Sequence, residues 1–171
     1  FSDQIQDWCS ERGVLHVGHI IEDDNSHGRL GCSTGHYFRT MSSFDMGGID
    51  VVLLQVMPGM DQETHQWVAS DRDGEFFHYG LGKLGSSAAH INQLHQGRAM
   101  CEIFGAFGWQ EGVSLMKWLA DHMLARGINY FVPHAFSPET YPDPDCPPHF
   151  YAGGRHMQYP YFQKLMEYVN R

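Results

Sequence analysis

The sequence predicts an α/β fold: a partial (β/α)8, or TIM, barrel of about four βα units with parallel strands. Three observations support this prediction. Short apolar segments alternate with segments of helical periodicity, which is the order of βα units in a parallel sheet. The short segments are apolar throughout, as expected when helices cover the sheet. Neither GxGxxG nor GxxxxGKS/T follows any of them, which argues against a nucleotide-binding fold and leaves half of a barrel as the prediction.

Residues 1–171 have the composition of a single globular segment with a hydrophobic core. Hydrophobic residues make up 42% and aromatic residues 13% of the chain, which excludes a disordered polypeptide. The net charge of −9 and the lack of a lysine and arginine block argue against a nucleic-acid partner. No run approaches the roughly 18 consecutive apolar residues of a membrane span. Because the chain starts at Phe1 and stops inside a helical pattern, we expect the other half of the barrel to precede it in a longer polypeptide.

The cysteines, at positions 9, 32, 101 and 146, form no CxxC pair and have no regular spacing. Cys9 and Cys101 lie in apolar patterns and are predicted to be small core residues. This usage favours a reducing compartment such as the cytoplasm over an oxidising one.

The first half of the chain contains two predicted βα units after an N-terminal helix. That helix covers residues 2–12 and ends at Gly13, which suits the left-handed position after a helix. A strand is predicted over residues 14–22, followed by an acidic loop. A short helix over residues 34–43 comes next, and the strand with the clearest pattern covers residues 49–56.

The second half repeats this order after a long polar connection over residues 57–80, a length that is usually functional or mobile. A helix over residues 84–96, with Ala88, Ala89, Ile91 and Leu94 as buried positions, precedes an apolar strand that ends at Glu102. The strongest helical pattern covers residues 111–126 and ends at Gly127. The remaining predicted elements are a strand over 128–134, a loop over 135–160 and a helix from Tyr161.

The ends of the predicted strands carry polar and titratable residues, and a barrel places its active site at these ends. They are Glu22, Gln55, Glu102 and His134, with Asp23, Asp24 and Trp109 just beyond. Two carboxyl groups on separate strands are what glycoside hydrolysis requires, one protonated and one ionised. Trp109, Phe107, Tyr130 and Phe136 could offer flat faces to sugar rings, although each is more often a core residue by itself. Glu102 also has a simpler interpretation, a carboxylate satisfied by an arginine or by backbone N–H groups.

Several segments resemble, in order, large bacterial glycoside hydrolases of the α-L-rhamnosidase-like type. Residues 101–109, Cys-Glu-Ile-Phe-Gly-Ala-Phe-Gly-Trp, resemble their strand end SE-x-(F/Y)-G-x-x-GW, with cysteine where serine is common. Residues 18–24 are similar to GH-x-x-E-(E/D)-D, and residues 48–50 to the end of PGID, with Gly47 in place of proline. The other similar segments are 116–118, 126–129, 132–137 and 145–151.

This resemblance implies a function and a set of site residues. It implies that Glu22 and Glu102 are the catalytic carboxylates, that His19 and His134 line the sugar subsite, and that the chain is the C-terminal half of the barrel. Glu102 is then the better candidate for the nucleophile or general base, and Glu22 for the acid. Gln55 and Trp109 complete the predicted substrate-binding residues for an oligosaccharide or glycoside.

Metal ions and a non-catalytic role are the alternatives to this interpretation. Rhamnosidase-like enzymes can use calcium, and Glu22, Asp23, Asp24 and Asn25 form an oxygen-rich cluster that could help to hold an ion. A solvated acidic loop is the favoured interpretation of that cluster. A zinc enzyme would need HxH or HExxH, and neither occurs. The chain could also be a non-catalytic carbohydrate-binding or scaffold portion of a larger protein. Carboxylates on opposite sides of the molecule, or one held in a buried ion pair, would argue against hydrolysis.

Overall fold

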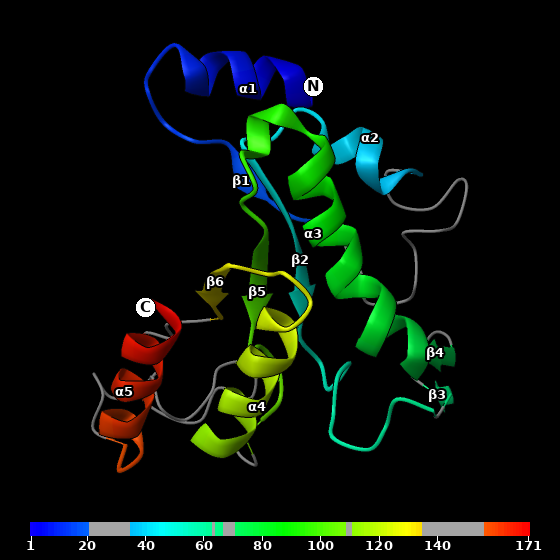
Figure 1. The fold of residues 1–171 in the computed structure, drawn as a ribbon, viewed down its shortest axis with the longest axis vertical. Helices are drawn as coiled ribbons and strands as arrows, with labels where there is room; N and C mark the ends of the chain where they lie inside the picture. Colours follow the sequence, from blue (N-terminus) through cyan, green and yellow to red (C-terminus); the bar gives the residue numbers. More distant parts are fainter. Residues whose placement is uncertain (21–34, 63, 67–70, 109–110, 135–155) are drawn as a thin grey trace.

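The computed structural model describes residues 1–20, 35–62, 64–66, 71–108, 111–134 and 156–171. These residues form an α/β fold whose four-stranded parallel sheet is curled like half a barrel (Figure 1). Its strands lie in the order β1-β2-β5-β6, with bounds Val17–Gly18, Met46–Val51, Met100–Ile103 and Tyr130–Pro133. The predicted α/β class and the parallel direction of the strands are therefore confirmed.

The helices fall close to their predicted places. They are α1, Ser2–Ser10; α2, Tyr37–Met41; α3, Leu81–Ile91; α4, Val113–Leu124; and α5, Tyr159–Val169. α3 and α4 lie against the same face of the sheet, and α5 lies beside α4 (Figure 1). The helix predicted over 84–96 instead ends at Ile91 and is followed by a short 3₁₀ turn. The prediction that Ile91 and Leu94 are buried was therefore wrong: the side chains are 70% and 43% exposed, whereas Ala88 and Ala89 are buried.

The long connection after β2 contains structure that the sequence pattern did not predict. Thr64–Gln66, labelled β3, pairs antiparallel with Asp71–Asp73, labelled β4, and a turn of π-helix covers Phe76–Gly80. Three-residue strands made of polar residues have no apolar alternation, so periodicity could not reveal them.

The hydrophobic core lies between the sheet and helices α3 and α4. Successive residues of a strand point to opposite faces, so Ile49 and Val51 of β2 and Cys101 and Ile103 of β5 face the core. The helices contribute Leu81, Ala88, Ala89, Met116, Leu119 and Met123. Cys9 and Cys101 are both buried, as predicted. The residues between them on the strands, Asp50 and Glu102, must therefore point to the opposite face.

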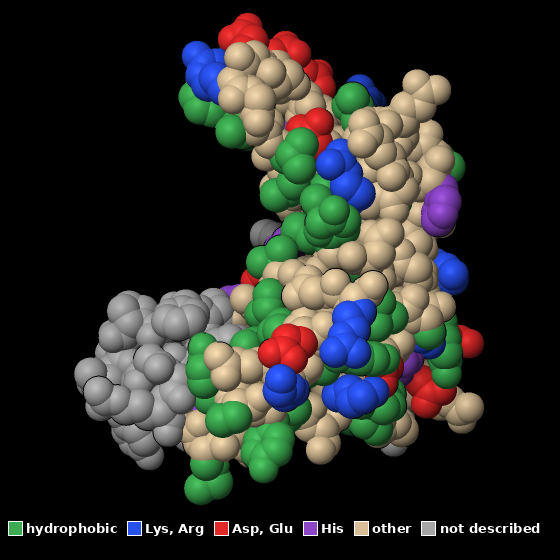
Figure 2. Space-filling model, turned by 60° about the vertical axis from the view of Figure 1, so that its left-hand side comes forward, with side chains coloured by type: hydrophobic (Ala, Val, Ile, Leu, Met, Phe, Trp, Pro, Cys, Tyr) green, Lys and Arg blue, Asp and Glu red, His purple; other side chains and the backbone are tan. Residues whose placement is uncertain are grey.

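That opposite face is partly open to solvent. Within the described residues, β1 and β6 each pair with one neighbouring strand and form the two edges of the sheet. Val17, Tyr130 and Val132 on these strands are 45–48% exposed. In Figure 2, the surface is hollowed on one side below the end that carries α1. Among the described helices, none has both the length and the apolar character needed to cross a membrane.

Candidate active site

Glu102 lies one residue before the end of β5, on the open face of the sheet. It is in register with Asp50 on β2 and with Val132 on β6. Residues in register on parallel strands point to the same face, so these side chains lie in one row. The side chain of Glu102 is 28% exposed, which leaves its carboxylate accessible to a ligand.

Two histidines from the edges of the sheet converge on this carboxylate. His19 follows β1, and its Nε2 lies 2.9 Å from Oε2 of Glu102. His134 follows β6, and its Nδ1 lies 2.6 Å from Oε1. The backbone N–H of His134 donates to the carbonyl of Ile103 at 2.8 Å, which continues the β5–β6 pairing up to the histidine. The parallel topology thus brings together three side chains that the sequence separates by 83 and 32 positions.

The hydrogen bonds of His19 indicate its charge. Its Nδ1 lies 3.1 Å from the carbonyl oxygen of Ile20, which can only accept a hydrogen bond. Its Nε2 faces the Glu102 carboxylate, which also accepts when ionised. Both contacts are satisfied when both ring nitrogens carry protons, which makes the ring a cation beside an anion.

The environment of Glu102 favours its ionised form. Burial raises the pKa of this carboxyl, but the hydrogen bonds and the positive charge of His134 and His19 more than offset burial, and the pKa lies below its ordinary value of 4.5. Each carboxylate oxygen has two lone pairs and accepts one histidine bond, so each retains the capacity to meet a ligand or water. Because both histidines and Glu102 are 23–28% exposed, this is not a buried ion pair.

Asp50 belongs to the same row, and the sequence analysis did not include it among the site residues. Its side chain is buried, and its Oδ2 lies 4.0 Å from Nδ1 of His19. The prediction that β2 covers residues 49–56 put Asp50 at the start of that strand, far from the end where a site was expected. An acid inside an otherwise apolar strand was the one available indication, as it was for Glu102.

The loops after β2 and β5 contain an unusual backbone. Leu53 and Leu54 have φ of 56° and 59°, and Phe104 and Ala106 have φ of 83° and 56°. Residues other than glycine rarely adopt these left-handed values, and such strain concentrates at functional sites. The N–H of Leu53 donates to the carbonyl of Gly105 at 2.9 Å, so the two loops support each other beside Glu102.

The early end of β2 corrects the prediction for Gln55. The strand ends at Val51, and Gln55 lies in the turn that follows. Its side chain is only 3% exposed, and its Oε1 accepts a hydrogen bond from the N–H of Val52 at 3.1 Å. Gln55 thus closes the turn and is not at a strand end, and its role in substrate binding stays a prediction.

The aromatic residues also have different roles. Phe107 is 1% exposed and belongs to the core, so the expectation that it stacks on a sugar was wrong. Tyr130 is 48% exposed and shares the face of Val132, beside Glu102. The other predicted residues lie outside the described residues: Glu22, Asp23, Asp24, Asn25, Trp109 and Phe136.

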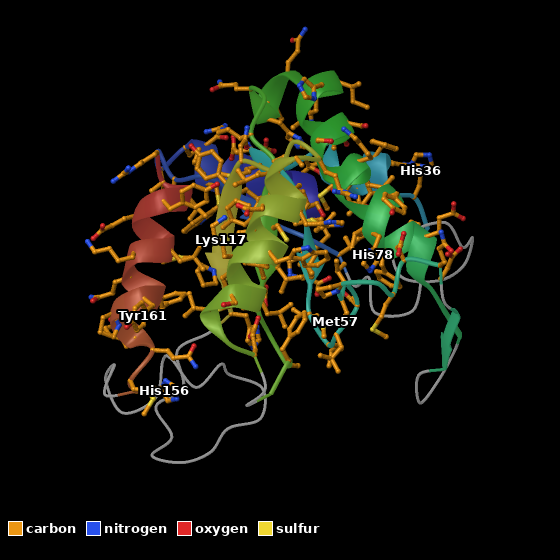
Figure 3. All side chains as sticks on the ribbon, turned by 60° about the horizontal axis from the view of Figure 1, so that its bottom comes forward. His36, Met57, His78, Lys117, His156 and Tyr161 are labelled. Atoms are coloured by element: carbon orange, nitrogen blue, oxygen red, sulfur yellow. The ribbon has the colours of Figure 1, made fainter. Side chains whose placement is uncertain are left out.

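A second histidine cluster has a structural role. His78 on the π-helical turn accepts a hydrogen bond from the N–H of Met57 at 3.3 Å (Figure 3). His122 on α4 stacks on Trp118 and donates to the His78 carbonyl at 3.0 Å, and burial lowers the pKa of His122 to about 4. The cluster therefore ties the connection after β2 to α4. Within the described part of the chain, no three His, Cys, Asp or Glu side chains are arranged to hold a metal ion.

Glu111, between β5 and α4, is a buried acid of a different kind. Its side chain is 1% exposed, and neither carboxyl oxygen has a hydrogen-bond partner among the described residues. Burial raises the pKa of Glu111 to about 9, so the group is a neutral carboxylic acid at pH 7. It lies just before α4, whose N-cap is Gly112, and not in the helix as predicted.

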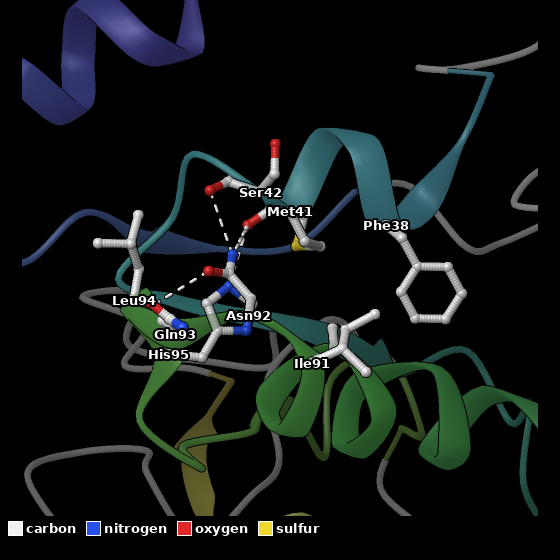
Figure 4. A pocket seen from close by; sticks show the side chains of 9 residues that line it. Phe38, Met41, Ser42, Ile91, Asn92, Gln93, Leu94 and His95 are labelled. Atoms are coloured by element: carbon white, nitrogen blue, oxygen red, sulfur yellow. Dashed lines mark hydrogen bonds between the residues drawn. The ribbon is translucent and has the colours of Figure 1, made fainter.

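A pocket of about 520 Å³ lies between α2 and the end of α3 (Figure 4). The residues that line the pocket come before β2 and before β5 in the chain, so the pocket lies at the N-terminal ends of these strands. Glu102 lies near the C-terminal end of β5, away from the pocket. Asn92 in its wall donates to the carbonyls of Met41 and Ser42, at 3.3 and 3.1 Å, and so holds the pocket walls together. The pocket is not part of the candidate active site.

Comparisons with models of known protein families, with curated proteins and with solved structures found no match to this chain.

Proposed function

We propose that this chain is part of a glycoside hydrolase in which Glu102 is the ionised catalytic carboxylate. The observation that supports the proposal most strongly is the carboxylate at a strand end, held by two histidines and still accessible. Its low pKa suits a nucleophile or a general base, because both roles need the charged form. The choice of this reaction class also follows from the resemblance to α-L-rhamnosidase-like enzymes, which the comparisons with known proteins did not detect.

In this mechanism, Glu102 either attacks the anomeric carbon or removes a proton from the attacking water. The first route retains and the second inverts the configuration, with carboxyl groups about 5 Å and roughly 6.5–9.5 Å apart, respectively. The N–H groups of His19 and His134 orient the carboxylate and keep it charged in the ground state. Glu22 is the proposed acid that donates a proton to the leaving oxygen.

We further propose that the curled sheet is half of a (β/α)8 barrel. Eight parallel strands close such a barrel, and four are present among the described residues. The exposed apolar side chains of Val17, Tyr130 and Val132 at the two edges are the kind of surface that further strands would cover. The rest of the parent polypeptide is the proposed source of those strands, and the open face of the sheet that carries Glu102 is the proposed sugar site.

The test is hydrolysis of a panel of aryl glycosides by the full-length polypeptide that contains this chain. Glu102→Gln keeps the shape of the side chain and removes its charge, so we expect kcat to fall by about 10²–10⁴-fold while sugar affinity, measured by calorimetry, changes little. Glu167→Gln is the matched control, because Glu167 lies on the surface of α5 and pairs with Lys164.

Three results would contradict the proposal. Activity that survives Glu102→Gln would remove Glu102 from the chemistry. Sugar binding that disappears in Glu102→Gln, without turnover in any form of the protein, would favour a carbohydrate-binding role. The lack of both hydrolysis and sugar binding in the full-length polypeptide would reject carbohydrate as the ligand.

A further inference from the structure

We propose that Gly105 is a positioning residue of the candidate active site, because its missing side chain leaves the space in which the His134 ring meets Glu102. Gly105 follows β5 and lies three residues after Glu102. A Cβ atom at this position would lie 2.8 Å from Cγ and 3.0 Å from Cδ2 of His134. Contacts below 3.0 Å do not occur between real Cβ atoms and their neighbours, so even alanine would displace the ring.

The ring cannot easily give way while keeping its bond to Glu102. Its Nδ1 lies 2.6 Å from Oε1 of Glu102, and the backbone N–H of His134 is fixed to Ile103. The same Cβ atom would also lie 3.0 Å from Cγ1 of Val52. Gly105 is therefore placed between a core side chain and a ring of the site, and a methyl group must move one of them.

The backbone holds Gly105 in this place. The carbonyl of Gly105 accepts from the N–H of Leu53 at 2.9 Å, and its neighbours Phe104 and Ala106 both have left-handed φ values. Strained residues on both sides of a position indicate that the surrounding structure requires that path of the chain. The loop thus carries residue 105 up to the His134 ring at an energetic cost, which a loop with no role at the site would not need.

The consequence concerns the charge of Glu102. His134 contributes the largest of the effects that lower the pKa of this carboxyl. If the ring moves away, burial acts on Glu102 with less opposition and its titration shifts upward. A larger residue at position 105 would therefore change the ionisation of Glu102 without touching that residue.

The experiment compares Gly105→Ala with Gly112→Ala in the full-length polypeptide that contains this chain. A Cβ atom at Gly112 meets no atom closer than 3.5 Å, so this control adds the same methyl group in the next segment without a clash. Glutamate labelled with ¹³C at Cδ reports the titration of Glu102 by NMR, with Glu102→Gln for assignment. We expect Gly105→Ala to raise the midpoint of Glu102 by about one pH unit or more, and Gly112→Ala to leave it unchanged. An unchanged midpoint in a folded Gly105→Ala variant would overturn the proposal.

A double-mutant cycle covers the case in which Gly105→Ala unfolds the chain. Removal of the ring in His134→Ala makes room for the new methyl group, so Gly105→Ala should lower the melting temperature much less in that background. A folded double variant beside an unfolded Gly105→Ala supports the proposal. Equal losses in both backgrounds, or two unfolded variants, would assign the glycine to the Val52 contact and overturn it.

Any effect of Gly105 on catalysis rests on the proposed function. In the full-length polypeptide, Gly105→Ala should then shift the acidic limb of the kcat/KM profile to higher pH by the same amount as the NMR titration. Failure of the proposed function can be distinguished from failure of the role of Gly105, because the NMR titration and the double-mutant cycle need no turnover. A shifted titration without hydrolysis would reject the proposed function and keep the role of Gly105.

Discussion

Glu102 and Glu111 are nine positions apart, and both are at least partly buried, yet their environments are opposite. Glu102 keeps 28% of its side chain exposed and receives hydrogen bonds from two histidines, and its pKa is lowered. Glu111 is almost completely buried without a partner, and its pKa is raised to about 9. Burial alone would have moved both groups upward. The positively charged donors at the strand ends therefore decide which glutamate is available as an anion.

The comparison separates a site from a buried acid in physical terms. A carboxyl group with donors and access to solvent can act on a ligand in its charged form. A carboxyl group without either is neutral and costs stability whenever it must ionise. The predictions below test each half of this contrast, from the largest expected change in free energy to the smallest.

The largest effect is expected on the pH dependence of stability, through Glu111. Its folded pKa of about 9 exceeds the ordinary value of 4.5, so its contribution to stability is complete below 4.5 and is lost as the pH rises toward 9. The free energy of unfolding should fall by up to about 1.4 kcal/mol per pH unit in this window. Glu111→Gln should flatten that slope and stabilise the chain at pH 8, measured by urea unfolding. The same slope in wild type and variant would show that Glu111 is ionised, or has a partner.

The next effect concerns His134, the stronger of the two donors to Glu102. His134→Ala removes the largest of the effects that lower the pKa of Glu102, so the titration midpoint of this carboxyl should rise. If Glu102 is catalytic, the acidic limb of the kcat/KM profile should follow. His90→Ala is the control, because His90 bonds within its own helix to the carbonyl of Ser86. If the titration midpoint of Glu102 is the same in His134→Ala and in the wild type, His134 does not lower the pKa of Glu102.

His19→Ala should act in the same direction with a smaller shift, because its hydrogen bond contributes less to lowering the pKa of Glu102. Removal of both histidines should bring the pKa of Glu102 above 4.5, where burial acts alone. Acid unfolding provides a second measurement. The stabilisation from ionised Glu102 is present above 4.5 and is lost as the pH falls through its lowered pKa. His19→Ala should therefore show a smaller loss on acidification, at a higher pH, and the double variant, whose pKa exceeds 4.5, should show none. A double variant that still titrates below 4.5 would require another source of positive charge.

The smallest effect is expected for a carboxylate at the surface, Asp121, whose side chain is 42% exposed. Asp121 on the outer face of α4 pairs with Lys117 and accepts from the hydroxyl of Tyr168 at 3.1 Å. Solvent and salt screen such pairs, so Asp121→Asn should leave the urea midpoint unchanged within error at physiological salt. A clear loss of stability would mean that exposure is not what distinguishes these carboxylates.

The sequence predicted the parts that depend on local pattern. Periodicity located the five helices and the strands around Ile49, Glu102 and Phe131, and the alternation of strands and helices predicted a parallel sheet. Because parallel strands end at one edge, it also predicted that Glu102 and His134 come together. The resemblance added His19.

The predictions that were wrong depend on the exact residue at which a strand ends and on packing between segments that are distant in the sequence. β2 stops at Val51 because the next residues turn through left-handed φ values, and this removed Gln55 from the strand end. Phe107 looked available to a sugar, but the same kind of turn after β5 directs it into the core. Asp50 reached the site only through its register with Glu102, which no single-chain pattern contains.

The most direct test of the account is one ¹³C NMR titration of the glutamate side chains in this chain, assigned with Glu102→Gln and Glu111→Gln. The account predicts two separated titrations, with Glu102 below 4.5 and Glu111 near 9. If both groups titrate together near 4.5, or if Glu102 titrates above Glu111, the histidines do not hold Glu102 as an anion. The central claim, that the two histidines lower the pKa of this carboxyl, would then be wrong.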